Sequence, residues 1–182
     1  MKKILKLTFI LFLVCAITAG ILGVVNEVTK DRIATLTEEK TVKAFNTVLK
    51  SDSYTELDFD SSNPVFKGID TIHKADNGEG WVVQSTFSGA QGSITMATGV
   101  SKDYECTGIS IISHSETSGL GANAASTAPV GVNFREQFIG QDDTVALKKA
   151  GGEIDALSGA TITSKSVTGA VAKAIAACES LG

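Results

Sequence analysis

A run of hydroxyl side chains lies near the C-terminus, between Ile154 and Val167. Five of its fourteen residues carry a hydroxyl group: Ser158, Thr161, Thr163, Ser164 and Ser166. A single acid, Asp155, stands ahead of them, and small residues separate them. Alcohol oxygens can both donate and accept hydrogen bonds, and an ordinary turn needs few of them. The composition of this stretch therefore indicates a binding site.

The sequence Ser-Gly-Ala-Thr at 158–161 precedes a helical pattern, which makes an anion such as phosphate a candidate ligand here. The first N–H groups of a helix lack partners, the helix dipole is positive at that end, and a glycine allows close approach. Lys165 would fall in the first turn, where its charge opposes the dipole unless an anion lies nearby. The alternative is a helix capped by Thr163 or Ser164 after a tight turn, with Lys165 solvated.

A second candidate loop runs from His114 to Gly121, after a strand-like segment. In it, Gly119 and Gly121 flank Leu120. Such a loop can lie flat against a planar ligand, with the leucine on a ring face and Thr117 or backbone groups at a polar edge. The alternative is an ordinary loop that ends a strand, with Leu120 in the core.

Other chemistries have little support in the residue pattern. Ser158 does not stand in a G-x-S-x-G motif, which disfavours a serine hydrolase. His73 and His114 are isolated and no zinc-ligand spacing occurs, so we expect no metal site and assign no catalytic residue. Cys106 and Cys178 are far apart in the sequence, and a disulfide between them is permitted outside the cell but not indicated.

The elements that must position these loops begin with an apolar segment. Residues 7–25 carry no charge, and nineteen residues at ~1.5 Å each nearly match a hydrocarbon core of about 30 Å. A cleavable signal peptide has a shorter apolar run and a clearer cleavage site than residues 16–20 offer. We therefore expect an uncleaved transmembrane helix over 7–27 after a cytoplasmic tail over 1–6.

Charge predicts the orientation of this helix. Lys2, Lys3 and Lys6 precede it, and positive flanks stay in the cytoplasm. We therefore expect a single-pass protein of the cell (inner) membrane, with its C-terminal domain on the periplasmic or exterior side. Without those three lysines, 13 of the 16 basic residues remain against 20 acids, a net charge of about −7. That balance argues against nucleic acid and anionic lipid headgroups as partners.

The rest of the chain predicts an α+β domain. Apolar residues at helical spacing, without Gly or Pro, indicate a stalk helix over 28–50 that packs on a domain formed by 51–182. Alternating β-rich runs separated by glycine-containing turns predict an antiparallel sheet with one buried face, flanked by helices. The predicted strands are 54–59, 80–87, 93–100, 107–114 and 144–147; the predicted helices are 133–139 and a terminal one through Val167–Cys178.

Together these features resemble the FMN-binding domain family. Its signature D-x-x-[ST]-G-A-[TS] is matched at 155–161, and its E-T-P-G-L-G loop is matched at 116–121 with serine in place of proline. The resemblance implies FMN joined by a phosphodiester bond to Thr161. It also implies that Asp155 is read by a flavin transferase. The implied cofactor-binding residues are Glu116, Thr117, Gly119, Leu120, Ser158, Gly159, Ala160 and Thr163.

Within that family, the short chain and single membrane helix resemble the G-subunit branch of the Rnf ion-translocating electron-transport complex. This resemblance implies an electron carrier in ferredoxin:NAD⁺ oxidoreduction coupled to Na⁺ or H⁺ transport, with no complete reaction by this chain alone. It also implies other membrane and peripheral Rnf subunits as partners, one of them a second FMN-bearing membrane subunit. The alternatives are the C subunit of the Na⁺-translocating NADH:quinone oxidoreductase, a flavin-binding extracytoplasmic sensing module, and a structural anchor that leaves the signature unused.

Overall fold

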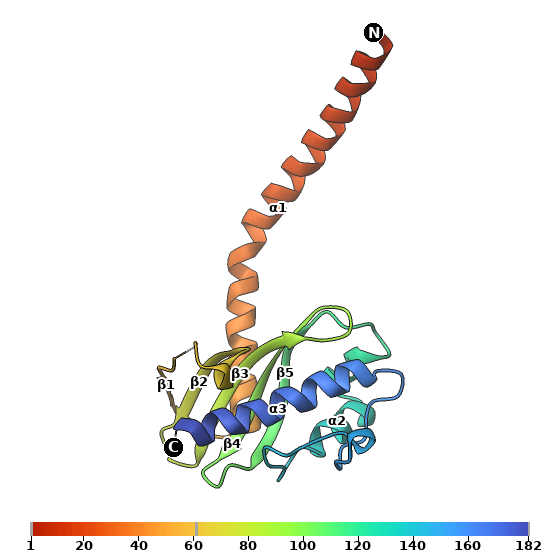
Figure 1. Ribbon diagram of the computed structural model, residues 1–182. Coiled ribbons are helices and arrows are strands. Elements are labelled where there is room, and N and C mark those ends of the chain that lie inside the picture. The colour runs from red at the N-terminus through yellow and green to blue at the C-terminus, as the bar shows by residue number, and fades with distance from the viewer. Residues whose placement is uncertain (1, 61, 182) are drawn as a thin grey trace. The chain divides into compact units, whose positions relative to one another are not determined.

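The computed structural model describes residues 2–60 and 62–181. The chain divides into two compact units, one up to Glu39 and one from Lys40 onward. Helix α1 (Lys2–Val48) is continuous through the boundary (Figure 1), so the predicted membrane and stalk helices form a single element. Among the described residues, α1 is the one helix long and apolar enough to cross a membrane. The large apolar side chains of its first unit are exposed, as expected for a segment that faces lipid.

A five-stranded antiparallel sheet forms the centre of the second unit, with its strands in chain order. The strands are β1 (Tyr54–Leu57), β2 (Ile69–Ala75), β3 (Gly80–Ser88), β4 (Ser93–Ser101) and β5 (Cys106–His114). The predicted meander is confirmed, but the sequence did not indicate β2. That strand carries Asp70, His73 and Lys74 and buries fully only Ile72 and Ala75, so its alternation is masked by charge.

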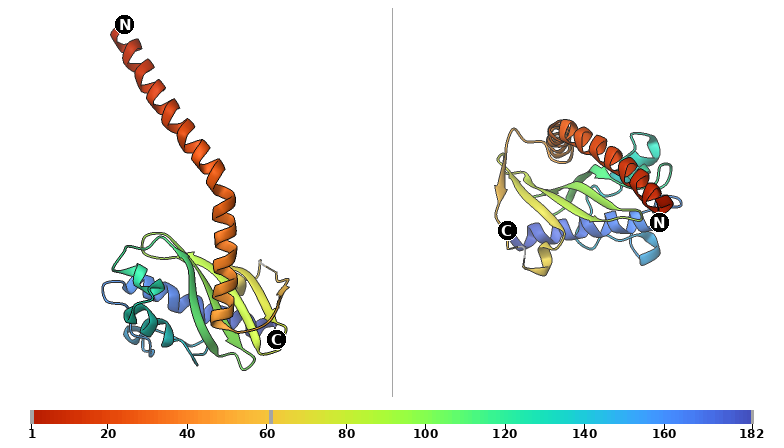
Figure 2. Two further views of the ribbon diagram at one scale, coloured as in Figure 1. Left: turned by 180° about the vertical axis from the view of Figure 1, so that it is seen from behind. Right: turned by 90° about the horizontal axis from the view of Figure 1, so that it is seen from above.

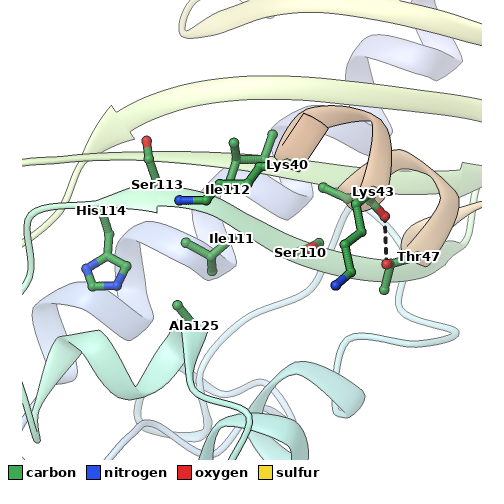
Figure 3. A pocket seen from close by; sticks show the side chains of 10 residues that line it. Lys40, Lys43, Thr47, Ser110, Ile111, Ile112, Ser113, His114 and Ala125 are labelled. Atoms are coloured by element: carbon green, nitrogen blue, oxygen red, sulfur yellow. Dashed lines mark hydrogen bonds between the residues drawn. The ribbon is translucent and has the colours of Figure 1, made fainter. Parts of the chain in front are cut away.

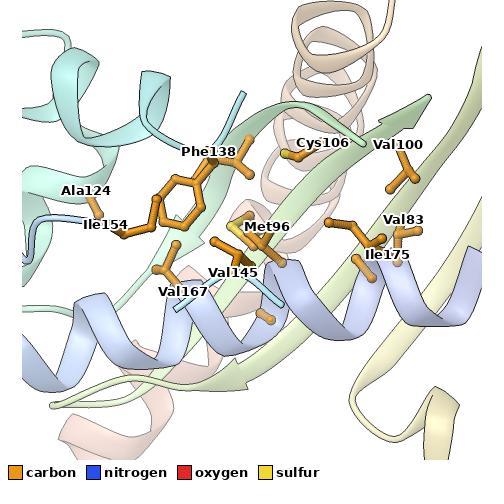
Figure 4. Close-up of a cluster of buried hydrophobic side chains, with 14 of the residues drawn as sticks. Val83, Met96, Val100, Cys106, Ala124, Phe138, Val145, Ile154, Val167 and Ile175 are labelled. Atoms are coloured by element: carbon orange, nitrogen blue, oxygen red, sulfur yellow. The ribbon is translucent and has the colours of Figure 1, made fainter. Parts of the chain in front are cut away.

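The two faces of the sheet bury two different clusters, because successive side chains in a strand point to opposite sides. Val83 and Met96 pack toward α3 (Thr161–Leu181), which crosses one face of the sheet (Figures 1 and 2). Their neighbours Val82 and Ala97 face the other way. Figure 4 shows part of the first cluster beside α3. The fold is α+β, and the sheet is covered on both faces rather than the single face expected.

The end of α1 covers the second face. Ala44, Phe45, Val48 and Leu49 are buried against the sheet, so the last turns of the predicted stalk belong to the domain core. The Thr107 hydroxyl donates to the Val48 carbonyl (2.5 Å). A side chain at Gly99 would collide with the Val48 backbone, and this glycine therefore lets the helix end approach the sheet closely.

Two other predicted elements differ from the structure. Helix α2 is Pro129–Glu136 rather than 133–139, because Pro129 suits the first turn, where no N–H bond is needed. The predicted strand at 144–147 does not form a strand. Only Leu147 pairs, through an isolated parallel bridge to Ile154. Short 3₁₀ helices complete the domain: η1 (Pro64–Phe66), η2 (Gly121–Ala125) and η3 (Lys148–Ala150).

The two cysteines of the domain are free thiols in its core. Cys106 and Cys178 are both buried and form no disulfide. Burial raises the pKa of each thiol to about 12, with a backbone hydrogen bond opposing the rise at Cys106 and nearby Glu179 adding to it at Cys178. Both thiols therefore stay protonated, and they serve as small apolar side chains rather than as nucleophiles.

Thr98 on β4 leads to a prediction about stability. Its side chain is fully buried, and its hydroxyl has no hydrogen-bond partner among the described residues. Thr98→Val keeps the shape and removes this unpaired group, so we expect the free energy of unfolding to rise by about 1 kcal/mol. A urea titration of the detergent-solubilised chain, followed by fluorescence of its one tryptophan, Trp81, measures the change.

Thr95→Val is the matched control. The Thr95 hydroxyl shares a hydrogen bond with that of Thr86 (3.0 Å), and its loss should give no stabilisation. An equal change in the free energy of unfolding for Thr98→Val and Thr95→Val would contradict the prediction for Thr98.

Candidate functional site

The two stretches that the sequence singles out meet in the folded domain. A side chain at Gly159 would touch Leu120 at 3.0 Å, so the leucine of the Gly-Leu-Gly loop lies against the glycine of the signature. The hydroxyl of Thr163, near the start of α3, donates a hydrogen bond to the carboxylate of Glu116. A surface site is therefore built from both motifs at the beginning of α3.

A tight turn presents the signature. The N–H of Ala160 donates to the carbonyl of Leu157 (3.0 Å). Gly159 has a φ of +70°, the value that the third residue of a type II turn requires. The Ser164 hydroxyl accepts a hydrogen bond from the Leu157 N–H and donates one to the Ala160 carbonyl (each 2.9 Å), which fixes the turn to the helix.

These bonds correct the predicted helix start. The helix begins at Thr161, three to four residues before the start that a cap at Thr163 or Ser164 would give. Neither hydroxyl caps the helix, because both are buried and bonded to other groups. Two of the five hydroxyls thus hold the local structure together and do not face solvent.

Thr161 is different. It is the first residue of a 21-residue helix and is exposed, and its hydroxyl has no hydrogen-bond partner among the described residues. The N–H groups of Thr161, Ile162 and Thr163 also lack acceptors in the described part of the chain, whereas that of Ser164 reaches Ala160. No acidic residue lies in the first turn. A free hydroxyl beside free N–H donors at a positive helix end can hold a phosphate group.

Glu116 connects the two motifs from inside the domain. It is 8% exposed, and its carboxylate accepts hydrogen bonds from the Gln91 N–H (3.0 Å) and the Thr163 hydroxyl. Burial acts to raise the pKa of Glu116, but these bonds and others from the Ala90 and Gly92 backbone together hold the pKa below its ordinary value. The carboxylate stays ionised and ties the β3–β4 turn, the loop after β5 and α3 to one another.

This lowered pKa gives a pH dependence with a definite sign. Because the folded protein favours the ionised form, Glu116 contributes stability above the ordinary glutamate pKa of about 4.3 and loses it as the pH falls through the lower folded value. We expect the free energy of unfolding to decrease more steeply below about pH 4.3 in the parent chain than in a Glu116→Gln variant. Urea titrations at stepped pH measure both curves, and coincident acid slopes would contradict the role of Glu116.

Asp155 lies on the surface just ahead of the turn. Its carboxylate is paired with Lys148 (2.6 Å), and both side chains are more than half exposed. The Asp155 N–H donates to the side chain of Gln137 (2.7 Å), the residue that follows α2, so the end of α2 helps to place Asp155. A pair so exposed adds little stability, and the carboxylate remains accessible to another protein.

The remaining predicted residues also lie at this surface. Ser158, Gly159 and Thr117 are exposed. Leu120 is 44% exposed, which excludes the alternative that it is a core residue. Ala160 is buried beneath the turn. The sequence did not indicate the β3–β4 turn as part of the site. Gly89 and Gly92 in that turn were the available signal, since a side chain at Gly89 would collide with the Glu116 carboxylate.

The arrangement fits FMN. The phosphate would be held at Thr161 and the free N–H groups after Gly159, and the exposed Leu120 beside Gly159 offers an apolar surface to a ring. Thr163 and Glu116 bond to each other, and their contact with the cofactor stays a prediction.

Comparisons with known proteins support an FMN-binding domain in this chain. The FMN-binding domain family matches residues 89–176, and the RnfG N-terminal region matches residues 1–48. The G subunit of the ion-translocating oxidoreductase complex of Methanosarcina acetivorans is 35% identical over 96% of this chain and 94% of its own. The G subunit of the Na⁺-translocating ferredoxin:NAD⁺ oxidoreductase complex of Acetobacterium woodii is 33% identical over 99% and 94%.

A solved structure is also similar. The C subunit of the Na⁺-translocating NADH-quinone reductase from Parabacteroides distasonis is 19% identical, with a TM-score of 0.49 over 76% of this chain and 80% of that one. The N-terminal region and the full-length relatives both favour the G-subunit interpretation over the quinone-reductase alternative. The chain therefore belongs to the family of G subunits of ion-translocating oxidoreductase (Rnf) complexes, and its exposed turn and helix start lie in that family's FMN-binding domain.

Proposed function

We propose that this domain carries FMN covalently, through a phosphodiester bond between the cofactor's phosphate and the Thr161 side-chain oxygen. The observation that supports this most directly is the exposed Thr161 hydroxyl at the first residue of α3. Neither this hydroxyl nor the N–H groups beside it has a hydrogen-bond partner among the described residues. Asp155, on the same surface, is the residue that a flavin transferase would recognise. A covalent bond keeps the cofactor on a protein that lies outside the cytoplasm, where no FMN pool could replace it.

The function that follows is electron relay within an Rnf complex, during ferredoxin:NAD⁺ oxidoreduction coupled to Na⁺ or H⁺ translocation. FMN, when bound, supplies the redox chemistry. The chain's own residues position it: Thr161 retains the phosphate end, the Gly159 turn brings backbone donors close, and Leu120 offers a ring contact. The full-length relatives, which are G subunits of such complexes, support this proposal. Other Rnf subunits, including a second FMN-bearing membrane subunit, would be its partners.

The experiment that tests this function uses the assembled complex. We expect reduced ferredoxin to bleach the visible absorbance of the flavin on this subunit and NAD⁺ to restore it. A complex that carries the Thr161→Val chain should lose both this signal and electron transfer. Flavin that is bound but never reduced by ferredoxin would overturn the relay and favour the sensing module.

We also propose that the second unit lies on the periplasmic or exterior side. Lys2, Lys3 and Lys6 ahead of the apolar segment support this orientation. Protease added to intact spheroplasts should digest the C-terminal domain, whereas protease added to inverted membrane vesicles should spare it. The opposite pattern would contradict the orientation and leave the site at Thr161 unaffected.

A further inference from the structure

The outer edge of β5 is open along most of its length. β5 is the last strand of the sheet, and among the described residues only its first one pairs outward. The Cys106 N–H donates to Gln141, and the Cys106 carbonyl accepts from Gly140 (each 2.8 Å). From Ile109 to Ser113, no backbone group bonds outward to another described residue. An open edge of this kind presents a row of donors and acceptors to which another strand can pair.

A groove follows this edge and lies entirely within the second unit. It has a volume of about 470 Å³. Ser110–His114 of β5 lie along it, the last turns of α1 form one wall, and Ala125 of η2 forms the other (Figure 3). Several lining side chains are small (Ala44, Thr47, Ser110 and Ser113), which leaves room for a backbone to approach. We call this feature the β5 groove.

The charge of the β5 groove is opposite to that of the domain. Lys40 and Lys43 line it, no Asp or Glu does, and neither lysine forms an ion pair within the described part of the chain. The chain after the apolar segment is acidic as a whole, with 20 acids against 13 basic residues. Lys40 and Lys43 are three residues apart on α1, so their side chains start from the same face at roughly 5–6 Å. Acids at alternate positions of a strand are about 6.7 Å apart, a matching interval.

We propose that the β5 groove binds an extended, acidic segment of another protein, which adds a strand to the sheet at β5. Backbone hydrogen bonds to the open edge would supply affinity. Carboxylates at alternate positions would pair with Lys40 and Lys43 and fix the register. This interface involves neither Thr161 nor the signature turn, so it goes beyond the proposed function and does not depend on it.

The first test places a photo-crosslinking amino acid at Ser110 in the full chain, within its native membrane complex. We expect a crosslink to one protein peptide that carries acids at alternate positions. Lys40→Glu combined with Lys43→Glu should lower the yield by about tenfold. Lys102→Glu combined with Lys149→Glu is the matched control, because both of these exposed lysines lie outside the groove, and the yield should be unchanged. The same probe at Glu56, on the opposite edge strand β1, should not capture this peptide.

The second test is hydrogen exchange of the same chain in the complex and alone in detergent. Amides between Ile109 and Ser113 should exchange about tenfold more slowly in the complex, and the Lys40→Glu, Lys43→Glu chain should lose this protection. Crosslinks only to lipid would assign the lysines to headgroup phosphates, and crosslinks to a second copy would assign the edge to self-association. Either of these results would overturn the proposal. So would the absence of a crosslink, a crosslink whose yield is unchanged by charge reversal, or equal exchange rates in the complex and in detergent.

Discussion

A Thr161→Val chain is expected to contain no covalently bound flavin when it is produced with the transferase. The change removes the exposed hydroxyl at the first residue of α3, which has no hydrogen-bond partner in the described part of the chain, while nearly preserving side-chain volume. Intact-mass spectrometry should show the unmodified polypeptide, and the fluorescent band that survives denaturing electrophoresis should disappear. Because no other oxygen occupies that position, we expect complete loss rather than a reduced yield.

Two further variants make this result specific. Thr161→Ser restores a hydroxyl at the same atom and should recover attachment. Ser158→Ala removes an exposed hydroxyl three residues earlier and should leave part of the flavin bound. A coloured band that persists in the Thr161→Val chain would show that another residue accepts the cofactor.

The second large effect concerns the bond between Thr163 and Glu116. Thr163→Val removes the hydroxyl that donates to a buried carboxylate, and hydrogen bonds to charged groups contribute about 1.5–3 kcal/mol. We expect the free energy of unfolding of the flavin-free chain to fall by that amount. Urea titration in detergent, followed by Trp81 fluorescence, measures it. Attachment of flavin should also decrease, because the loop around Leu120 loses its link to α3.

Thr161→Val is the matched control for this measurement. It makes the same chemical change two residues away, at an exposed hydroxyl that no described residue bonds, and should alter the free energy of unfolding by less than about 0.5 kcal/mol. Thr161→Val therefore tests flavin attachment at nearly constant stability, whereas Thr163→Val tests the free energy of unfolding. Equal stability of the two flavin-free chains would show that the bond from Thr163 contributes nothing to the fold.

The sequence predicts those parts of the fold whose patterns are local. The apolar segment, the strands β3 to β5 and the terminal helix are each visible in a single stretch of residues. β2 is not visible in this way, because Asp70, His73 and Lys74 mask the alternation of apolar and polar residues. Pairing with β1 and β3 defines this strand. The strand expected at 144–147 has suitable residues but no continuous partner.

For the site, the motifs indicate residues that the fold brings together, but not the contacts that each of them makes. Thr161 and Asp155 could be singled out from the signature alone. The pairing of Glu116 with Thr163 could not, because 47 residues separate them and the bond exists only after the sheet brings β5 to α3. The hydroxyls of Thr163 and Ser164 suggested a phosphate seat or a cap. Their burial shows that they brace the turn that presents their neighbour.

The helix that anchors the chain also completes the domain. The end of α1 (Ala44, Phe45 and Val48) and the next residue, Leu49, cover Val82, Ala97 and Ile112. A soluble fragment that starts after Lys50 would therefore leave an apolar sheet face in contact with water, and such a face drives aggregation. Cleavage of α1 ahead of Lys40 leaves the residues that pack on this sheet face within the fragment. Release of a stable, water-soluble flavin domain thus depends on where the linking helix is cut, and not only on removal of the lipid-facing residues.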